Sequence, residues 1–133
     1  MRTIIDTNIA IYLRDAHIEI SEAIRVLPRA PMMSVVTRVE LEGGIHRNPA
    51  DAPALRSRVD ALLEIMEELP FTSAEAEVYG RIVARCGFSR ARIIDRMIAA
   101  TAIVADATLI TINGDDFRDI QGLKLDVWPS PTI

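Results

Sequence analysis

Acidic side chains follow several of the apolar stretches along this chain. Asp6 ends the β-branched run Thr3–Ile5, and Glu40 comes shortly after the apolar letters "MMSVV". Asp95 lies near the start of "RIIDRMIAATAIVA", and Asp116 lies in "TINGDDF", directly after the run "ATLIT". Ligands and catalytic groups of an open α/β sheet gather where its strands end. We therefore expect these carboxylates to meet at one rim of such a sheet.

Several carboxylates at one rim would repel each other, and the repulsion grows as water is excluded. A bound cation would hold such a cluster together. Ligands that are all oxygen, without His or Cys, favour hard ions, so we expect Mg²⁺ or Mn²⁺. Such an ion lowers the pKa of a bound water and neutralises charge on a phosphodiester. The acids therefore predict metal-assisted phosphodiester chemistry.

Two of these acids also have an ordinary structural explanation as helix caps. Asp-Thr-Asn after a strand is typical of a helix N-cap, which would account for Asp6. Thr37 and Glu40 have the spacing of a capping box, and Thr72 and Glu75 share it without any sign of function. The capping and catalytic interpretations therefore both remain open for Asp6 and Glu40.

The two later acids have structural explanations as well. Asp95 lies between Arg92 and Arg96, which could pair with it, and it would interact favourably with a helix dipole. Asn113 precedes a glycine, as in many turns, and Asp116 could cap a short helix. A role in stability therefore remains open at both places.

The net charge of −4 disfavours nucleic acid as a partner, but the distribution of charge is uneven. Residues 81–96 contain five arginines and one acid, whereas residues 60–77 contain six acids and no base. A locally basic face can bind phosphates on an acidic protein, although solvated helices also carry such charge. The candidate RNA contacts are Arg38, Arg81, Arg92 and Arg96.

Length and composition fit one globular domain over residues 1–133, half of whose residues are apolar. The only cysteine, Cys86, cannot form an internal disulfide, as expected in a reducing compartment. Charges at Arg14 and Asp15 interrupt the first apolar stretch, so neither a signal peptide nor a membrane span is expected. We expect a cytoplasmic protein.

Strand-like and helix-like segments alternate along the chain. The apolar pattern predicts strands over 3–5, 32–36, 69–71, 107–111 and 123–128. It predicts helices over 7–15, 20–27, 37–49, 54–67, 73–85 and 92–105, with the third weakened or ended by Gly43 and Gly44. Parallel neighbours need a crossover, so the order implies an α/β fold with a mostly parallel central sheet between two helical layers.

Four motifs in this order resemble the PIN-domain ribonucleases, and among them the VapC-type toxins of bacterial toxin-antitoxin pairs. They are "IIDTN" from Ile4, "SVVTRVELEGGI" from Ser34, "IIDRMIAATA" from Ile93 and "LITINGDDF" from Leu109. The resemblance spans nearly the whole chain, and its strength lies in the combination of motifs. It implies a single PIN domain over residues 1–133 with the three-layer α/β/α fold.

The resemblance also implies roles for particular residues. Asp6, Glu40 and Asp95 match the three main acidic positions, and Asp116 best matches the fourth. Asn113 stands where many members carry an aspartate, which leaves open how many metal ions bind. By the same likeness, the catalytic residues and metal ligands are Asp6, Glu40, Asp95 and Asp116, supported by Thr7, Asn8, Thr111 and Asn113.

The resemblance implies a Mg²⁺-dependent endoribonuclease that forms a homodimer and is blocked by a VapB-like antitoxin. A non-catalytic domain of the same fold that binds RNA or protein is an alternative. A phosphatase or phospho-receiver would also place an aspartate after the first strand. However, Asn8 replaces the second aspartate of the phosphatase pattern, and the only lysine, Lys124, lies in a predicted strand.

Overall fold

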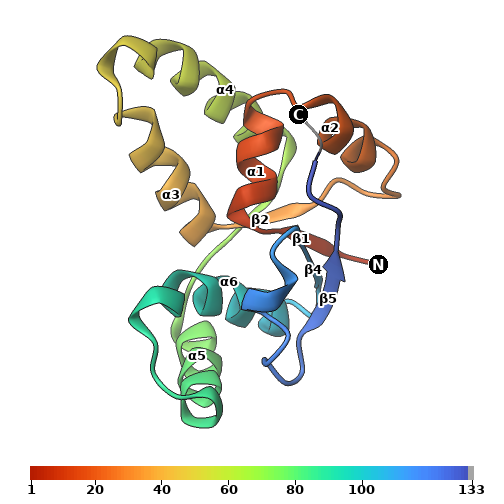
Figure 1. The fold of residues 1–133 in the computed structure, drawn as a ribbon, viewed down its shortest axis with the longest axis vertical. Helices are drawn as coiled ribbons and strands as arrows, with labels where there is room; N and C mark the ends of the chain where they lie inside the picture. Colours follow the sequence, from red (N-terminus) through yellow and green to blue (C-terminus); the bar gives the residue numbers. More distant parts are fainter. Residues whose placement is uncertain (132–133) are drawn as a thin grey trace.

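A five-stranded parallel sheet forms the centre of the molecule in the computed structural model, which describes residues 1–131 (Figure 1). The strand order is β3-β2-β1-β4-β5, and every neighbouring pair is parallel. The strands are β1 (Thr3–Ile5), β2 (Met32–Ser34), β3 (Glu68–Leu69), β4 (Thr108–Thr111) and β5 (Lys124–Val127). This topology confirms the predicted α/β class, and all strand pairs are parallel rather than most of them.

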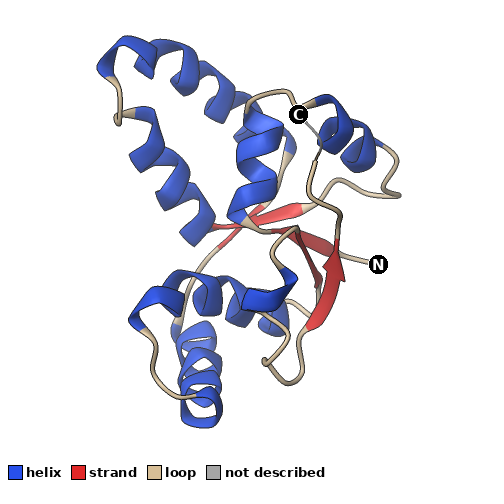
Figure 2. Ribbon diagram, in the orientation of Figure 1, coloured by secondary structure: helices blue, strands red, loops and turns tan. Residues whose placement is uncertain are grey.

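Six α-helices within residues 1–131 connect the strands and cover both faces of the sheet (Figure 2). They are α1 (Thr7–Arg14), α2 (Ile18–Arg25), α3 (Val35–Ile45), α4 (Ala52–Ile65), α5 (Ser73–Cys86) and α6 (Ile93–Val104). Three short 3₁₀ helices are η1 (Pro49–Asp51), η2 (Arg90–Arg92) and η3 (Gly114–Asp116). Helices α1 to α4 lie on one side of the sheet, and α5 and α6 lie on the other (Figure 1).

Neighbouring residues of the central strands feed two separate cores. Ile4 and Met32 pack with α5 and α6, whereas Ile5 and Met33 pack with α1 to α4. Successive strand side chains point to opposite faces, so a strand covered on both sides must be apolar at every position. The three-layer α/β/α arrangement therefore follows from short, uninterrupted apolar strands.

The third predicted helix differs from the structure at its start and at its glycines. Strand β2 ends at Ser34, because the Ser34 side chain accepts a hydrogen bond from Val36 N and caps α3. The predicted strand over 32–36 therefore extends two residues too far. Gly43 and Gly44 lie within α3, which continues to Ile45. Packing of the buried Leu41 and Ile45 offsets the weak helix propensity of the glycines.

The remaining segments agree with the sequence to within a few residues at their ends. None of the helices within residues 1–131 is long and apolar enough to cross a membrane. The domain predicted over 1–133 includes residues 132 and 133, which lie outside the described part of the chain.

Candidate active site

Asp6 lies at the carboxyl end of the central strand β1 and is 3% exposed. Its Oδ1 accepts a 2.8 Å hydrogen bond from Thr7 N and caps α1, and its Oδ2 accepts a 2.8 Å hydrogen bond from the Thr111 hydroxyl. Burial raises the pKa of Asp6 above its usual range, and these hydrogen bonds oppose that rise. Asp6 is therefore both a helix cap and a buried acid at the rim where ligands of such sheets bind.

Glu40 reaches the same rim from α3. The Thr7 hydroxyl donates a 2.5 Å hydrogen bond to Glu40 Oε1 and lies 3.1 Å from the Thr37 hydroxyl. A hydroxyl has one proton, so Thr7 must accept from Thr37 while it donates to Glu40. Ser34 caps α3, which places Thr37 and Glu40 inside the helix and excludes the capping-box interpretation. The predicted box at Thr72 and Glu75 does form.

Asp95 lies in the first turn of α6, and Asp116 ends η3. Arg92 Nη1 donates to the Asp116 main-chain oxygen at 3.0 Å and lies 3.3 Å from its Oδ1. Arg92 thus joins the start of α6 to η3. The sequence suggested that Arg92 or Arg96 might pair with Asp95, but the ion pair of Arg92 is with Asp116.

The charges of these acids act on one another. Partial burial raises the pKa of Asp95 to about 6, and the neighbouring charges of Asp6, Asp116 and Glu40 add to the rise. Arg92 opposes it. Glu40 and Asp116 also contribute to the raised pKa of Asp6. Four carboxylates from four separate segments therefore share one electrostatic environment, and their mutual repulsion is only partly compensated.

The other predicted supporting residues lie around this cluster. Thr111, the last residue of β4, accepts a hydrogen bond from Asn113 N while it donates to Asp6. Asn113 is the N-cap residue of η3, and its side chain is exposed. The buried Asn8 Oδ1 has no hydrogen-bond partner in the described structure. The sequence missed Thr37, although its spacing of three residues from Glu40 placed both on one helical face.

The donor set suits a hard cation, but the side chains are not yet arranged around one. All four acids offer oxygen, their charges repel, and Asn8 adds an unpaired buried oxygen. Within residues 1–131, however, no group of three or more His, Cys, Asp or Glu side chains is positioned to hold a metal ion. Side-chain rotation would therefore have to accompany metal binding.

The structure changes the interpretation of the predicted RNA-binding arginines. Arg96 is 3% exposed, and its Nη1 donates to Gly87 O at 2.6 Å. A guanidinium buried in this way cannot reach RNA, so the prediction for Arg96 is wrong. Arg38 pairs with Glu42 and Glu68. Arg81 is exposed and lines a groove of about 620 Å³ with apolar residues of α5 and α6.

Lys124 lies far from the position that a phospho-receiver would require. It is the first residue of β5 and aligns with Thr108, the first residue of β4. In a parallel sheet, this register places it at the edge opposite the strand ends that carry the acids. Its amine pairs with Asp106 at 2.8 Å. The geometry therefore argues against a receiver site.

Comparison with known proteins gives one family match and several similar structures. Residues 3–123 match the PIN domain family. None of the curated proteins matches the chain. A chain of VapBC2 from Rickettsia felis, bound to a DNA fragment from their promoter, is 25% identical with a TM-score of 0.84, and the match covers 96% of this chain and 99% of that one.

Two further solved structures are similar over nearly their whole length. A chain of VapBC-1 from nontypeable Haemophilus influenzae is 27% identical with a TM-score of 0.78, covering 96% of this chain and 98% of that one. A chain of FitAcB from Neisseria gonorrhoeae is 23% identical with a TM-score of 0.77, covering 92% and 95%. The last likeness concerns the fold alone.

Proposed function

The chain belongs to the PIN domain family, and we propose that it is a metal-dependent endoribonuclease that acts as the toxin of a toxin-antitoxin pair. Family membership confirms the resemblance that the four motifs indicated. The observation that carries the proposal is the grouping of Asp6, Glu40, Asp95 and Asp116, from four separate segments, at one rim of the sheet, where burial and their mutual charges raise the pKa of Asp95. Carboxylates kept in such mutual repulsion are typical of functional sites.

Asp6, Glu40, Asp95 and Asp116 would hold Mg²⁺ or Mn²⁺. Such an ion would supply a water of lowered pKa and neutralise the charge that develops on the phosphate. Thr111 orients Asp6 through Oδ2, and Thr7 orients Glu40 through Oε1. These hydroxyls restrict the motion of two of the four carboxylates, which reduces the cost of ordering the site when a metal ion binds.

The proposed partner is a VapB-like antitoxin, supported by the similar chains from VapBC complexes of R. felis and H. influenzae. The toxin itself would form a homodimer. An antitoxin that covers the rim would block RNA from the acids and so keep the enzyme silent. The metal ligands support phosphodiester chemistry, and the family resemblance supports RNA as the substrate.

A non-catalytic PIN domain is the second candidate function. One observation favours it: within the described chain, no three acidic side chains converge on a metal position. Such a protein would bind RNA or a partner and cut nothing. The two candidates differ in whether divalent cations change the covalent state of RNA.

The deciding experiment incubates the purified protein with a mixed RNA pool, first with Mg²⁺ and then with excess EDTA. We expect cleavage with Mg²⁺ and none with EDTA. Asp6→Asn and Asp95→Asn should each lower the cleavage rate by at least about 100-fold, because each removes a charged metal ligand. Asparagine at position 6 can still accept the hydrogen bond from Thr7 N that caps α1.

Asp106→Asn is the matched control, because Asp106 is an exposed aspartate that precedes β4 at the opposite edge of the sheet. Its positive φ of 52° is one that asparagine tolerates. This variant should cleave as the wild type does. Cleavage that persists in EDTA, or in both site variants, would refute the proposal. Binding of RNA without any cleavage would favour the second candidate.

A further inference from the structure

The aromatic side chain of Phe88 is largely exposed to solvent. It lies between α5 and η2 and is 67% exposed, and it is the only aromatic among the large exposed apolar residues of the described chain. An isolated exposed apolar residue is ordinary, but an aromatic ring also offers a flat face on which a nucleic-acid base can stack. The question is whether its surroundings suit such a ligand.

Hydrogen bonds hold the two residues that precede Phe88. Gly87 has a φ of 87°, which redirects the chain at the end of α5, and its carbonyl accepts a 2.6 Å hydrogen bond from the buried Arg96. Arg96 Nη2 also lies 3.8 Å from Asp119 Oδ2, and the Cys86 thiol donates to Asp119 O at 3.5 Å. These contacts explain the burial of Arg96: it fixes the residue that precedes Phe88.

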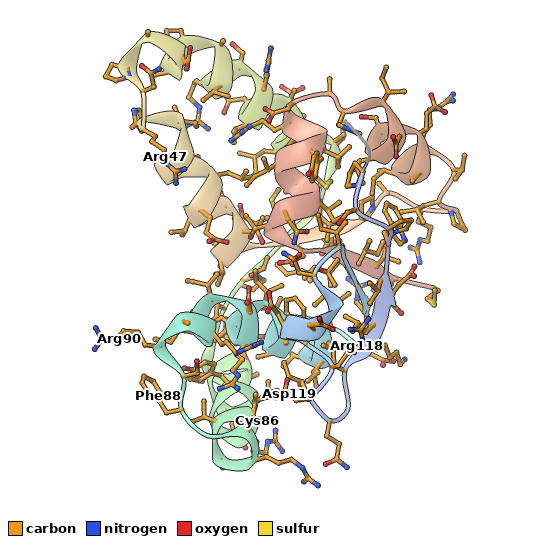
Figure 3. The ribbon with its side chains drawn as sticks, viewed as in Figure 1. Arg47, Cys86, Phe88, Arg90, Arg118 and Asp119 are labelled. Atoms are coloured by element: carbon orange, nitrogen blue, oxygen red, sulfur yellow. The ribbon has the colours of Figure 1, made fainter. Side chains whose placement is uncertain are left out.

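A cation without a partner among the described residues follows Phe88 in the chain. Arg90 is exposed and follows Phe88 by two residues. Figure 3 shows both side chains extending outward from the segment between α5 and α6, away from the labelled pair Cys86 and Asp119. Arg90 forms no ion pair or hydrogen bond with other described residues. The same is true of Arg29, Arg47, Arg81 and Arg85. Its charge is therefore available to an anionic ligand.

This loop leads directly into the acid cluster. Four residue steps separate Phe88 from Arg92, so their Cα atoms are at most about 14 Å apart. Arg92 contacts Asp116, and Asp95 follows one helical turn later. The segment that carries Phe88 and Arg90 therefore lies near enough to the acids for one extended polyanion, bound there through a metal ion, to contact both places.

We propose that Phe88 and Arg90 form a platform for single-stranded RNA, on which one base stacks on the Phe88 ring and a nearby phosphate pairs with Arg90. This inference rests on the proposed function and adds two residues outside the acid cluster that contact the substrate. Bases of a duplex are stacked on one another and cannot offer their faces, whereas bases of single strands can. The platform therefore favours unpaired RNA over a duplex.

The test measures RNA binding rather than cleavage, so that it stands apart from the proposed activity. Asp95→Asn serves as the parent protein, and a fluorescent 12-nucleotide single-stranded RNA of mixed sequence is titrated by anisotropy with Mg²⁺ present. The same RNA annealed to its complement is the second probe. We expect the parent to bind the single strand at least about fivefold more tightly than the duplex.

Substitutions at Phe88 separate stacking from general apolar contact. Phe88→Ala and Phe88→Leu should each weaken binding of the single strand at least about fivefold, and Phe88→Trp should restore it, because only an aromatic ring stacks. Arg90→Ala should weaken binding and reduce its dependence on salt. Ile65→Ala is the matched control, since Ile65 is 65% exposed on α4 and should bind RNA as the parent does.

Equal binding of single strand and duplex by the parent would overturn the platform, as would unchanged binding by Phe88→Ala. Phe88→Leu binding as tightly as the parent would also overturn it and would indicate an apolar surface for a protein partner. Cleavage by the wild type is measured separately, so a failed platform leaves the nuclease proposal standing. A failed cleavage assay likewise leaves the binding result interpretable.

Discussion

Helix α3 carries two glutamates, two residues apart, in opposite electrostatic surroundings. Glu42 accepts from Arg56 at 2.6 and 3.0 Å and from Arg38 at 3.4 Å. The hydrogen bonds from Arg56 lower the pKa of Glu42 to about 2. Glu40 faces Asp6 and Asp95 instead, and it accepts its hydrogen bond from the neutral Thr7 hydroxyl.

The two clusters differ in how completely their charges are compensated. Around Glu42, cations alternate with acids, since Arg56 also reaches Asp60 and Arg38 also reaches Glu68, so the network ties α3 to α4 and β3. Around Asp95, burial and the charges of three other acids raise its pKa to about 6, and Arg92 compensates only in part. An unneutralised cluster costs stability, and a bound cation can recover that cost.

The largest expected effect is on catalysis. Asp6→Asn should lower RNA cleavage with Mg²⁺ by at least about 100-fold. Glu42→Gln should leave the rate within about twofold of the wild type, because Glu42 pairs with Arg38 and Arg56 rather than with the group of acids around Asp95. Single-turnover cleavage of one RNA by both variants measures this contrast. A comparable loss in Glu42→Gln would mean that the two clusters are not functionally distinct.

The second effect is on metal-dependent stability. A ligand that binds only the folded state stabilises it by about 2.7 kcal/mol at a hundredfold excess over its Kd. Mg²⁺ should therefore raise the unfolding temperature of the wild type and of Glu42→Gln by several degrees. Asp6→Asn should show little change. Thermal unfolding with Mg²⁺ and with EDTA provides the measurement, and an equal shift in all three proteins would place the ion elsewhere.

The two clusters should respond to neutralisation with opposite signs when no metal is present. Glu42→Gln should lower the free energy of unfolding by about 1 kcal/mol, since it breaks a bidentate pair with Arg56 at a partly exposed site. Asp95→Asn should raise the free energy of unfolding by about 1 kcal/mol, because it relieves the repulsion among the four acids. Solvent at this partly exposed site screens that repulsion and keeps the gain small. Urea unfolding in EDTA at pH 7.5 measures both, and destabilisation by Asp95→Asn would contradict this assignment.

The smallest effect is a pH dependence. The pKa of Asp95 is raised to about 6 in the folded state from an ordinary value of 3.8, so the folded protein binds the proton more tightly than the unfolded one. Ionised Asp95 therefore destabilises the folded state. This destabilisation is fully present above pH 6 and disappears as the pH falls toward 4. The stability difference between Asp95→Asn and wild type should shrink over this interval. A difference that stays constant from pH 7.5 to 4 would refute the raised pKa.

Local patterns were enough to predict most of the fold. Thr3–Ile5 and Thr108–Thr111 are short apolar strands buried on both faces, and the acids that follow such strands or begin the next helices lie at one rim, as expected for parallel strands. The start of α3 was missed because Val35 and Val36 favour strands by propensity. Ser34 was the overlooked signal, since a serine before a helical pattern is a typical N-cap.

Side-chain partners were the part that the sequence could not provide. Arg96 looked like one of several exposed arginines, but its contact with Gly87 depends on how the loop after α5 folds back on α6. Arg92 lies three residues before Asp95 yet pairs with Asp116, which is distant in sequence. Such pairings depend on tertiary packing, which a periodic pattern does not encode.

The most direct test of a shared metal centre is a crystal of the protein soaked in Mn²⁺, with an anomalous difference map calculated from the diffraction data. We expect one strong peak within coordination distance, about 2.0–2.3 Å, of carboxylate oxygens from both Asp6 and Asp95, with side chains rotated from the positions that they hold in this structure. A map in which Mn²⁺ binds elsewhere, or contacts only one of these two acids, would contradict the proposed site.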